Sequence, residues 1–219
     1  MGIIREERIG DCRLILGDCM EVMPGLGLVD AVVTDPPYGL GAKMKGGTWG
    51  AKEAFTGFLK WDLDAKQEWV ETIVALDVPA IIWGGNYFVV PPSRCWLIWS
   101  KVNAVPTMAD FEQAWTNFDR PSKRFEGNVG RVEFGHPTQK PIALMRWCLG
   151  FLPDAKTILD PFMGSGTTLV ACAKMGRKGI GIELDPGYFQ TACERVQRAY
   201  DEPDLFNPAP KTAKQEILL

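Results

Sequence analysis

The chain has 219 residues, of which 46% are hydrophobic and 23% are charged. A chain of this length buries a sizeable core without disulfides or metals, and this composition excludes wholesale disorder and a fibrous protein. The formal net charge of −3 excludes a uniformly basic protein that coats nucleic acid. It does not exclude a nucleic-acid enzyme, because such an enzyme needs basic residues on one face only.

Cysteine and histidine usage gives no sign of a metal site. The six cysteines include no CxxC pair, and His136 is the single histidine. The first ten residues lack the apolar stretch of a secretion signal, and no run approaches the ~20 apolar residues of a membrane span. We therefore expect a cytoplasmic protein with free buried thiols, no metal and no membrane association.

Short apolar runs alternate with helical patterns along most of the chain. Buried parallel strands are predicted over 12–17, 30–34, 80–83, 96–99, 156–159 and 179–182. Helix starts are predicted at Asp18 with Glu21, at Asp64 with Gln67 and at Asp185-Pro186, and further helices over 141–150 and 166–174. This alternation predicts an open, doubly wound α/β sheet in a single domain over 1–200.

Two stretches and the tail interrupt the alternation. Residues 40–63 are rich in Gly, Lys and aromatics, and residues 102–139 mix Pro, Asn and Arg with two short strand-like runs. We expect both to be loops over the carboxyl ends of the strands, where open α/β sheets bind ligands. Residues 91–147 carry eight basic and five acidic side chains, which suits either a DNA backbone contact or a solvated loop. Residues 201–219, with three prolines, are expected to form a loosely held arm.

A glycine-rich turn follows the strand predicted at 156–159. In TILDPFMGSGTTLVACAKMG, Gly164 and Gly166 would let the backbone approach a ligand at the start of the next helix. A purely structural turn is an equally good interpretation of these glycines alone. Glu183, at the end of the following strand, has about the spacing of an acid that binds ribose hydroxyls. Because the turn lacks a P-loop lysine and full GxGxxG spacing, it favours an adenosine without phosphates.

A second rigid turn, Asp35-Pro36-Pro37-Tyr38, directly follows the strand predicted at 30–34. Its two prolines fix φ and remove two backbone donors, so nearby carbonyls stay free to accept hydrogen bonds. An exocyclic amine could donate to the Asp35 carboxylate and the Pro36 carbonyl while the Tyr38 ring stacks on the attached base. A bare Asp-Pro-Pro would favour an ordinary turn, but its place at a strand end beside a second elbow favours function.

Three motifs in order resemble those of S-adenosylmethionine-dependent amino-methyltransferases that act on DNA: DPPY at 35–38, HPTQKP at 136–141 and DPFMGSGTT at 160–168. The catalytic motif precedes the cofactor motif, as in the permuted β-class. The resemblance spans roughly residues 10–200 and implies a Rossmann-like fold, with a mostly parallel seven-stranded sheet and helices on both faces. DPPY implies N6 methylation of adenine, and the segment at 109–118 is similar to that of phage and prophage enzymes.

The resemblance also implies roles for individual residues. Asp35, Pro36, Pro37 and Tyr38 would hold a flipped target base. The S-adenosylmethionine site would include Asp18, Cys19, Asp35, Thr138, Lys140, Asp160, Phe162, Gly164, Ser165, Gly166, Thr167 and Glu183. Among these, Asp18 would meet the cofactor's adenine, Glu183 its ribose, and Thr138 with Lys140 its methionine carboxylate. DNA contacts are expected from Lys43, Lys45, Arg120, Lys123, Arg124 and Arg131.

The segment for reading DNA sequence is short. Members of the family with developed specificity usually carry a long insertion, whereas this chain offers only about residues 119–135. The recognition sequence in double-stranded DNA would then be short or relaxed, or a second subunit would share in reading it. Both a homodimer and a restriction endonuclease partner therefore stay open. Other open alternatives are N4-cytosine methylation, methylation of RNA or of a protein amide, and a non-catalytic DNA-binding accessory protein that retains the fold.

Overall fold

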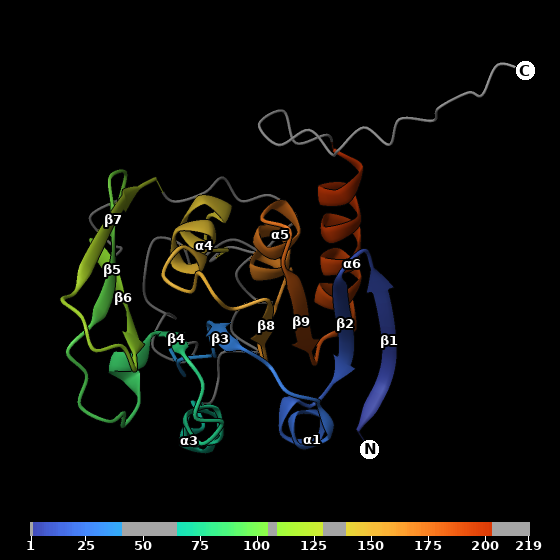
Figure 1. The fold of residues 1–219 in the computed structure, drawn as a ribbon, viewed down its shortest axis with the longest axis horizontal. Helices are drawn as coiled ribbons and strands as arrows, with labels where there is room; N and C mark the ends of the chain where they lie inside the picture. The colour runs from blue at the N-terminus through green and yellow to red at the C-terminus, as the bar shows by residue number, and fades with distance from the viewer. Residues whose placement is uncertain (1, 41–64, 105–108, 129–138, 203–219) are drawn as a thin grey trace, which may run out of the picture.

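One mixed sheet forms the centre of the computed structural model, which describes residues 2–40, 65–104, 109–128 and 139–202 (Figure 1). The strand order is β1-β2-β9-β8-β3-β4-β6-β5-β7. Seven strands share one direction, while β1 and β6 run antiparallel to their neighbours. The strands are β1 Ile3–Ile9, β2 Cys12–Gly17, β3 Ala31–Thr34, β4 Ala80–Trp83, β5 Trp96–Lys101, β6 Phe111–Thr116, β7 Lys123–Gly127, β8 Thr157–Asp160 and β9 Lys178–Glu183.

Helices cover both faces of the sheet (Figure 1). One face carries α4 (Ile142–Leu149), α5 (Thr167–Lys174) and α6 (Pro186–Asp201), and the other carries α1 (Cys19–Val22) and α3 (Gln67–Val74). Along β3, Ala31 and Val33 pack in the cluster that contains α4, whereas Val32 packs in the cluster that contains α1 and α3. The central strands are buried on both sides, which explains why their sequences are continuous apolar runs. The doubly wound α/β arrangement is therefore confirmed.

Two of the three predicted helix starts are present. The Asp18 carboxylate accepts a hydrogen bond from the Met20 amide at 2.8 Å, and Asp185 caps α6 in the same way. The capping box predicted for α3 is wrong, because the N-cap residue is Lys66, which makes no side-chain cap. Two single-turn 3-10 helices, η1 (Met23–Gly25) and η3 (Gly85–Tyr87), complete the described elements. Among the described helices, none is both long and apolar enough to cross a membrane.

The sheet departs from prediction at its edges. It has nine strands in the described residues rather than seven. The edge strand β1 was not predicted, since its sequence IIREERI is largely exposed and has no apolar run. Residues 102–139, expected to form a loop with two short strand-like runs, contain the strands β6 and β7, with β6 inserted between β4 and β5. Only the second half of β6 is buried, so its first half reads as polar sequence.

Candidate active site

The two predicted turns meet at the carboxyl edge of the sheet. Strands β3 and β8 are parallel neighbours, so Asp35 and the glycine-rich turn follow adjacent strand ends. The Thr34 hydroxyl donates to the buried Asp160 carboxylate at 2.7 Å, and the Phe162 amide donates to the same oxygen at 3.1 Å. Burial raises the pKa of Asp160 to about 6. Asp160 thus ties the strand before DPPY to the turn that follows β8.

The glycine-rich turn is held in place from α6. Gly166 is the N-cap of α5 with φ of +81°, a left-handed conformation that favours glycine, and a Cβ there would press on Ala192 of α6. The buried Arg195 of α6 donates to the Ser165 carbonyl at 2.5 Å and to its hydroxyl at 2.7 Å. The turn is therefore fixed before any ligand binds.

A cavity lies between the two turns. Its wall comes from the ends of β3 and β8, from the start of α5 and from the segment before α4. The lining residues are Thr34, Asp35, Gln139, Lys140, Met145, Asp160, Phe162, Met163, Gly164, Ser165, Thr167 and Thr168. The predicted cofactor residues in this wall are Asp35, Lys140, Asp160, Phe162, Gly164, Ser165 and Thr167, whereas Thr138 lies outside the described residues.

Four further predicted cofactor residues lie outside that wall: Gly166, which caps α5, and Asp18, Cys19 and Glu183 at the same sheet edge. Leu16 of β2 pairs with Glu183 of β9, which brings Asp18 and Cys19 to the end of β9. The Glu183 carboxylate accepts from the Asp185 amide at 2.7 Å, and burial raises its pKa to about 7. Burial also raises the pKa of the Cys19 thiol to about 12. These residues extend the polar rim beyond the glycine-rich turn.

The donor set fits an adenosine cofactor with an amino-acid moiety. The turn offers glycine backbone and the Ser165 hydroxyl, and Glu183 offers a carboxylate to hydroxyl groups. The side-chain oxygen of Gln139 is buried, and no described residue donates a hydrogen bond to it. An orphaned acceptor in a cavity wall suits a ligand that brings a donor, such as an ammonium group.

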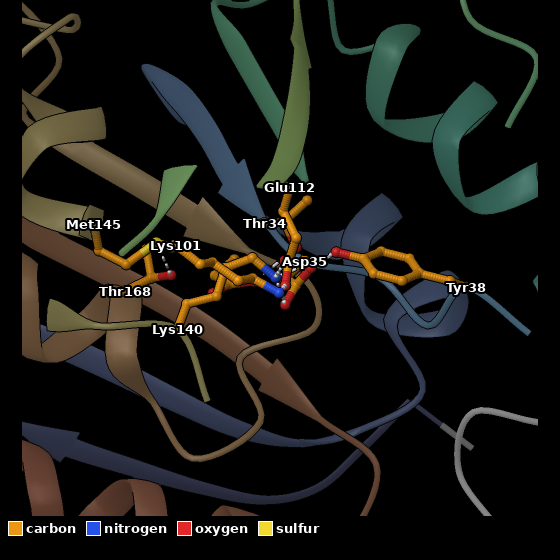
Figure 2. A network of polar contacts seen from close by, with 9 residues as sticks. Thr34, Asp35, Tyr38, Lys101, Glu112, Lys140, Met145 and Thr168 are labelled. Atoms are coloured by element: carbon orange, nitrogen blue, oxygen red, sulfur yellow. Dashed lines mark hydrogen bonds and ion pairs between the residues drawn. The ribbon is translucent and has the colours of Figure 1, made fainter. Parts of the chain in front are cut away.

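A network of charged groups surrounds Asp35 (Figure 2). The Tyr38 hydroxyl donates to Asp35 Oδ1, and Lys140 Nζ donates to Asp35 Oδ2 at 2.5 Å. Lys140 Nζ also lies 3.1 Å from Glu112 Oε2 and 3.2 Å from the Tyr38 oxygen. Lys101 Nζ lies 2.6 Å from Glu112 Oε1. Both lysine side chains are only 5% exposed, whereas 34% of the Asp35 side chain remains exposed.

The charges in this network shift one another's pKa values. The enclosed site and Glu112 raise the pKa of Asp35 above its usual range, against the opposing effect of the Lys140 ammonium. Burial would raise the pKa of Glu112, but Lys140 and Lys101 outweigh it and lower this pKa to about 2. Burial would lower the pKa of Lys140, but Asp35 and Glu112 raise it overall. The network thus joins two carboxyl groups and two amino groups, whose formal charges cancel.

The geometry favours another role for Lys140 than contact with the methionine carboxylate, which stays a prediction. An ammonium has three hydrogens, and the three acceptors next to Nζ are Asp35, Glu112 and Tyr38. Contact with a methionine carboxylate would require Lys140 to give up one of these partners. The lysine of HPTQKP thus belongs to the Asp35 side of the cavity.

The Tyr38 ring is supported by the turn after β4. It stacks on Tyr87 of η3, with ring centroids 4.8 Å apart and planes inclined by 20°. Gly84 has φ of +66°, and a Cβ on this residue would overlap the Tyr38 ring. Lys140 Nζ lies 5.7 Å from the centre of the same ring. Glycine at position 84 is therefore needed for both the turn and the tyrosine.

Sequence reasoning missed several residues of this site. Glu112 and Lys101 reach it from β6 and β5, and no motif or spacing links them to Asp35. Gln139 lies within HPTQKP and could have been found there. Tyr87 follows β4 whereas Tyr38 follows β3, so only the fold brings these two rings into contact.

Of the predicted DNA-binding residues, the three that the structure describes are not brought to Asp35. Lys43, Lys45 and Arg131 lie outside the described residues. Arg120 lies in the connection between β6 and β7, and Lys123 and Arg124 are the first two residues of β7. Because β6 is antiparallel to β4, this connection lies at the sheet edge opposite Asp35. Arg120 packs over the Phe118 ring, with its guanidinium carbon 5.0 Å from the ring centre. A DNA contact at these residues stays a prediction.

Comparison with known proteins supports one class of enzyme. A family described as DNA methylase, of the N6/N4 methyltransferase type, matches residues 90–194. The Type II methyltransferase M.HpaI of Haemophilus parainfluenzae is 24% identical over 94% of this chain and 81% of its own length. These similarities support a relationship of the chain to the S-adenosylmethionine-dependent DNA amino-methyltransferases.

Two further similarities extend along most of the chain. The putative methylase YubD of Escherichia coli K12 is 28% identical over 87% of the chain and 93% of its own length. The protein in the crystal structure of the M1.HpyAVI–SAM complex is 26% identical in sequence to this chain. The match covers 84% of this chain and 98% of that chain, with a TM-score of 0.57. The Rossmann-like fold implied by the sequence is confirmed. DPPY lies before the residues that the family matches, so the catalytic assignment depends on the geometry above.

Proposed function

We propose that the chain transfers a methyl group from S-adenosylmethionine to the exocyclic N6 amine of adenine in double-stranded DNA. The observation that carries this proposal is the position of Asp35. It ends the central strand β3 within DPPY, one-third exposed, and lines the same cavity as the glycine-rich turn. A partly exposed carboxylate beside the glycine-rich turn supports this proposal, because an amine bound to it would face a methyl donor held at that turn.

Methyl transfer to the adenine amine would require two contributions from Asp35. The adenine amine is a poor nucleophile, because its lone pair is delocalised into the ring. Hydrogen bonds from the amine to the Asp35 carboxylate and the Pro36 carbonyl would favour a pyramidal nitrogen with its lone pair free. When bound, the cofactor supplies a methyl group on a positively charged sulfur. As positive charge passes to the nitrogen, Asp35 stabilises it and then accepts the departing proton.

The surroundings of Asp35 suit both tasks. Its raised pKa makes it a better proton acceptor than an ordinary aspartate. Its two oxygens already accept from the Tyr38 hydroxyl and from Lys140, at the positions that an amine would use. The target amine would replace one of these donors. The carboxylate is therefore pre-organised to accept hydrogen bonds from nitrogen.

The remaining binding groups follow from the cavity. A base inside a duplex has to be flipped out, at a cost of a few kcal/mol, and stacking on the Tyr38 ring would recover part of that cost. The turn at Gly164 and Ser165 and the orphaned oxygen of Gln139 would hold the amino-acid part of the cofactor. Glu183 would bind its ribose hydroxyls, and Asp18 its adenine.

Nucleoside analysis tests the proposal directly. Double-stranded DNA is incubated with the chain and methyl-labelled S-adenosylmethionine, digested to nucleosides and examined by mass spectrometry. We expect labelled N6-methyladenine. Labelled N4-methylcytosine would overturn the assigned base, and label in RNA or protein alone would overturn the substrate. Cofactor binding in calorimetry without any transfer would favour the non-catalytic accessory protein.

A further inference from the structure

Four buried or half-buried charges alternate in sign at the carboxyl edge of the sheet. The order in space is Asp35, Lys140, Glu112 and Lys101, linked at 2.5, 3.1 and 2.6 Å (Figure 2). They come from four separate parts of the chain, and the two lysine side chains are almost inaccessible to water. Charges cost several kcal/mol each to remove from water unless they are paired. The formal charges of the two carboxyl groups and the two amino groups in this cluster therefore cancel.

We propose that Glu112 is a positioning residue for methyl transfer. It takes over the Lys140 ammonium when the target amine occupies Asp35, and it balances the charge of that lysine while positive charge builds on the amine. This role depends on the proposed function, because it concerns the amine that Asp35 would bind.

The geometry lets Lys140 change partners without a rearrangement of the sheet. Its Nζ already lies within reach of both carboxylates, 2.5 Å from Asp35 and 3.1 Å from Glu112. Glu112 itself is held, because it pairs with Trp99 in the β5–β6 ladder and its other oxygen binds Lys101. A lysine ammonium rotates freely about its stem and donates three hydrogen bonds. An amine that enters at Asp35 Oδ2 would thus leave Lys140 bound to Glu112.

The charge balance explains why an acid is needed there. With Glu112, the cluster sums to zero before the reaction and to one positive charge as the amine is methylated. Without Glu112, two lysines would face Asp35 alone, and the site would start with a positive charge. As the sulfur–methyl bond breaks and the nitrogen–methyl bond forms, the positive charge of the sulfonium would move to the amine beside this already positive cluster, where like charges repel strongly.

Glu112 also tunes the protonation of Asp35. The titratable groups that face Asp35 are Lys140, Glu112, Tyr38 and, from the end of β8, Asp160. The enclosed site is the largest cause of the raised pKa of Asp35, and Glu112 adds to it. Loss of the Glu112 charge should therefore lower the pKa of Asp35. The acid limb of the rate profile would move to lower pH even though the maximum rate falls.

Single-turnover kinetics of the full chain can separate this role from a structural one. The rate of methyl transfer to DNA is measured at saturating cofactor and DNA for the wild type, Glu112→Gln and the double variant Glu112→Gln/Lys101→Met. We expect Glu112→Gln to be about 10- to 100-fold slower, with the acid limb shifted to lower pH and cofactor affinity unchanged. The double variant removes one charge of each sign and should recover at least part of the rate. Glu7→Gln, an exposed ion-paired glutamate in β1, serves as the matched control.

Each outcome decides between the alternatives. A wild-type chain that does not methylate DNA would refute the proposed function, whereas an active wild type with an equally active Glu112→Gln would refute only the role of Glu112. A double variant slower than Glu112→Gln, or an unmoved acid limb, would also refute it. If Glu112→Gln does not fold, as judged by circular dichroism, the double variant alone decides. A rate within about tenfold of the wild type would support charge balance, and a larger loss would contradict it.

Discussion

Replacing Asp35 by Asn should stop most methyl transfer without removing the cofactor. Lys140 shows that a nitrogen approaches Asp35 Oδ2 within hydrogen-bond distance. A full positive charge ~3 Å from the carboxylate would be stabilised by roughly 5 kcal/mol at an effective dielectric constant of about 20. For a charge half developed in the transition state the figure is roughly 2–3 kcal/mol. The variant should therefore transfer methyl groups about 100-fold more slowly.

The assay is single-turnover transfer of labelled methyl groups to DNA at saturating cofactor, with the cofactor dissociation constant measured by calorimetry. Asn keeps the size of Asp, and Lys140 retains Glu112 as an anionic partner, so the fold should persist. Asp154→Asn, an exposed aspartate before β8, is the matched control and should behave as the wild type. A rate for Asp35→Asn within threefold of the wild type would refute the role of its charge.

Three further perturbations test the surroundings of Asp35. Tyr38→Ala should slow transfer more than Tyr38→Phe in the same assay, since stacking needs the ring, while Phe loses only the hydrogen bond to Asp35; the reverse order would argue against stacking. Gly84→Ala should lower the free energy of unfolding in urea by about 1–3 kcal/mol. The control Gly176→Ala should lower it by less, because Gly176 has φ of +65° but open space around it. Equal losses in the two variants would mean that the Tyr38 ring does not obstruct a side chain at position 84. The pKa of Asp160 is raised to about 6 in the folded chain, so between pH ~4 and ~6 the folded wild type binds more protons than the unfolded wild type. The free energy of unfolding of the wild type should therefore fall as the pH rises through that window. Asp160→Asn should remove up to about 3 kcal/mol of this dependence, and parallel curves of unfolding free energy against pH would contradict it.

Much of the sheet could be predicted because its central strands are buried on both faces. Ala80–Trp83 and Cys12–Gly17 were predicted to the residue, since their apolar runs need no knowledge of partners. The edge strand β1 was not predicted, because its charged side chains pair with one another at the surface, as Arg5 does with Glu7. Strand β6 was expected only as a strand-like run within a loop, because its polar first half faces the site rather than the core.

The candidate site divides in the same way. DPPY and the glycine-rich turn were found because rigid turns leave a local signal in proline and glycine. Glu112 and Lys101 were not found, because their contacts with Lys140 and with each other exist only once β5 and β6 lie beside β4. The contact between Tyr38 and Tyr87 likewise joins the loop after β3 to the turn after β4. Charge pairs over long sequence separations leave no pattern along the chain.

The most direct test is to sequence DNA from cells that express the chain, with read-out of methylated positions. A host without adenine or cytosine methylation of its own carries either the wild-type chain or Asp35→Asn. We predict N6-methyladenine at defined sites with the wild type and its near absence with the variant. Methylated cytosine in place of adenine, or equal adenine methylation in both strains, would contradict the assignment of Asp35 to adenine N6 transfer.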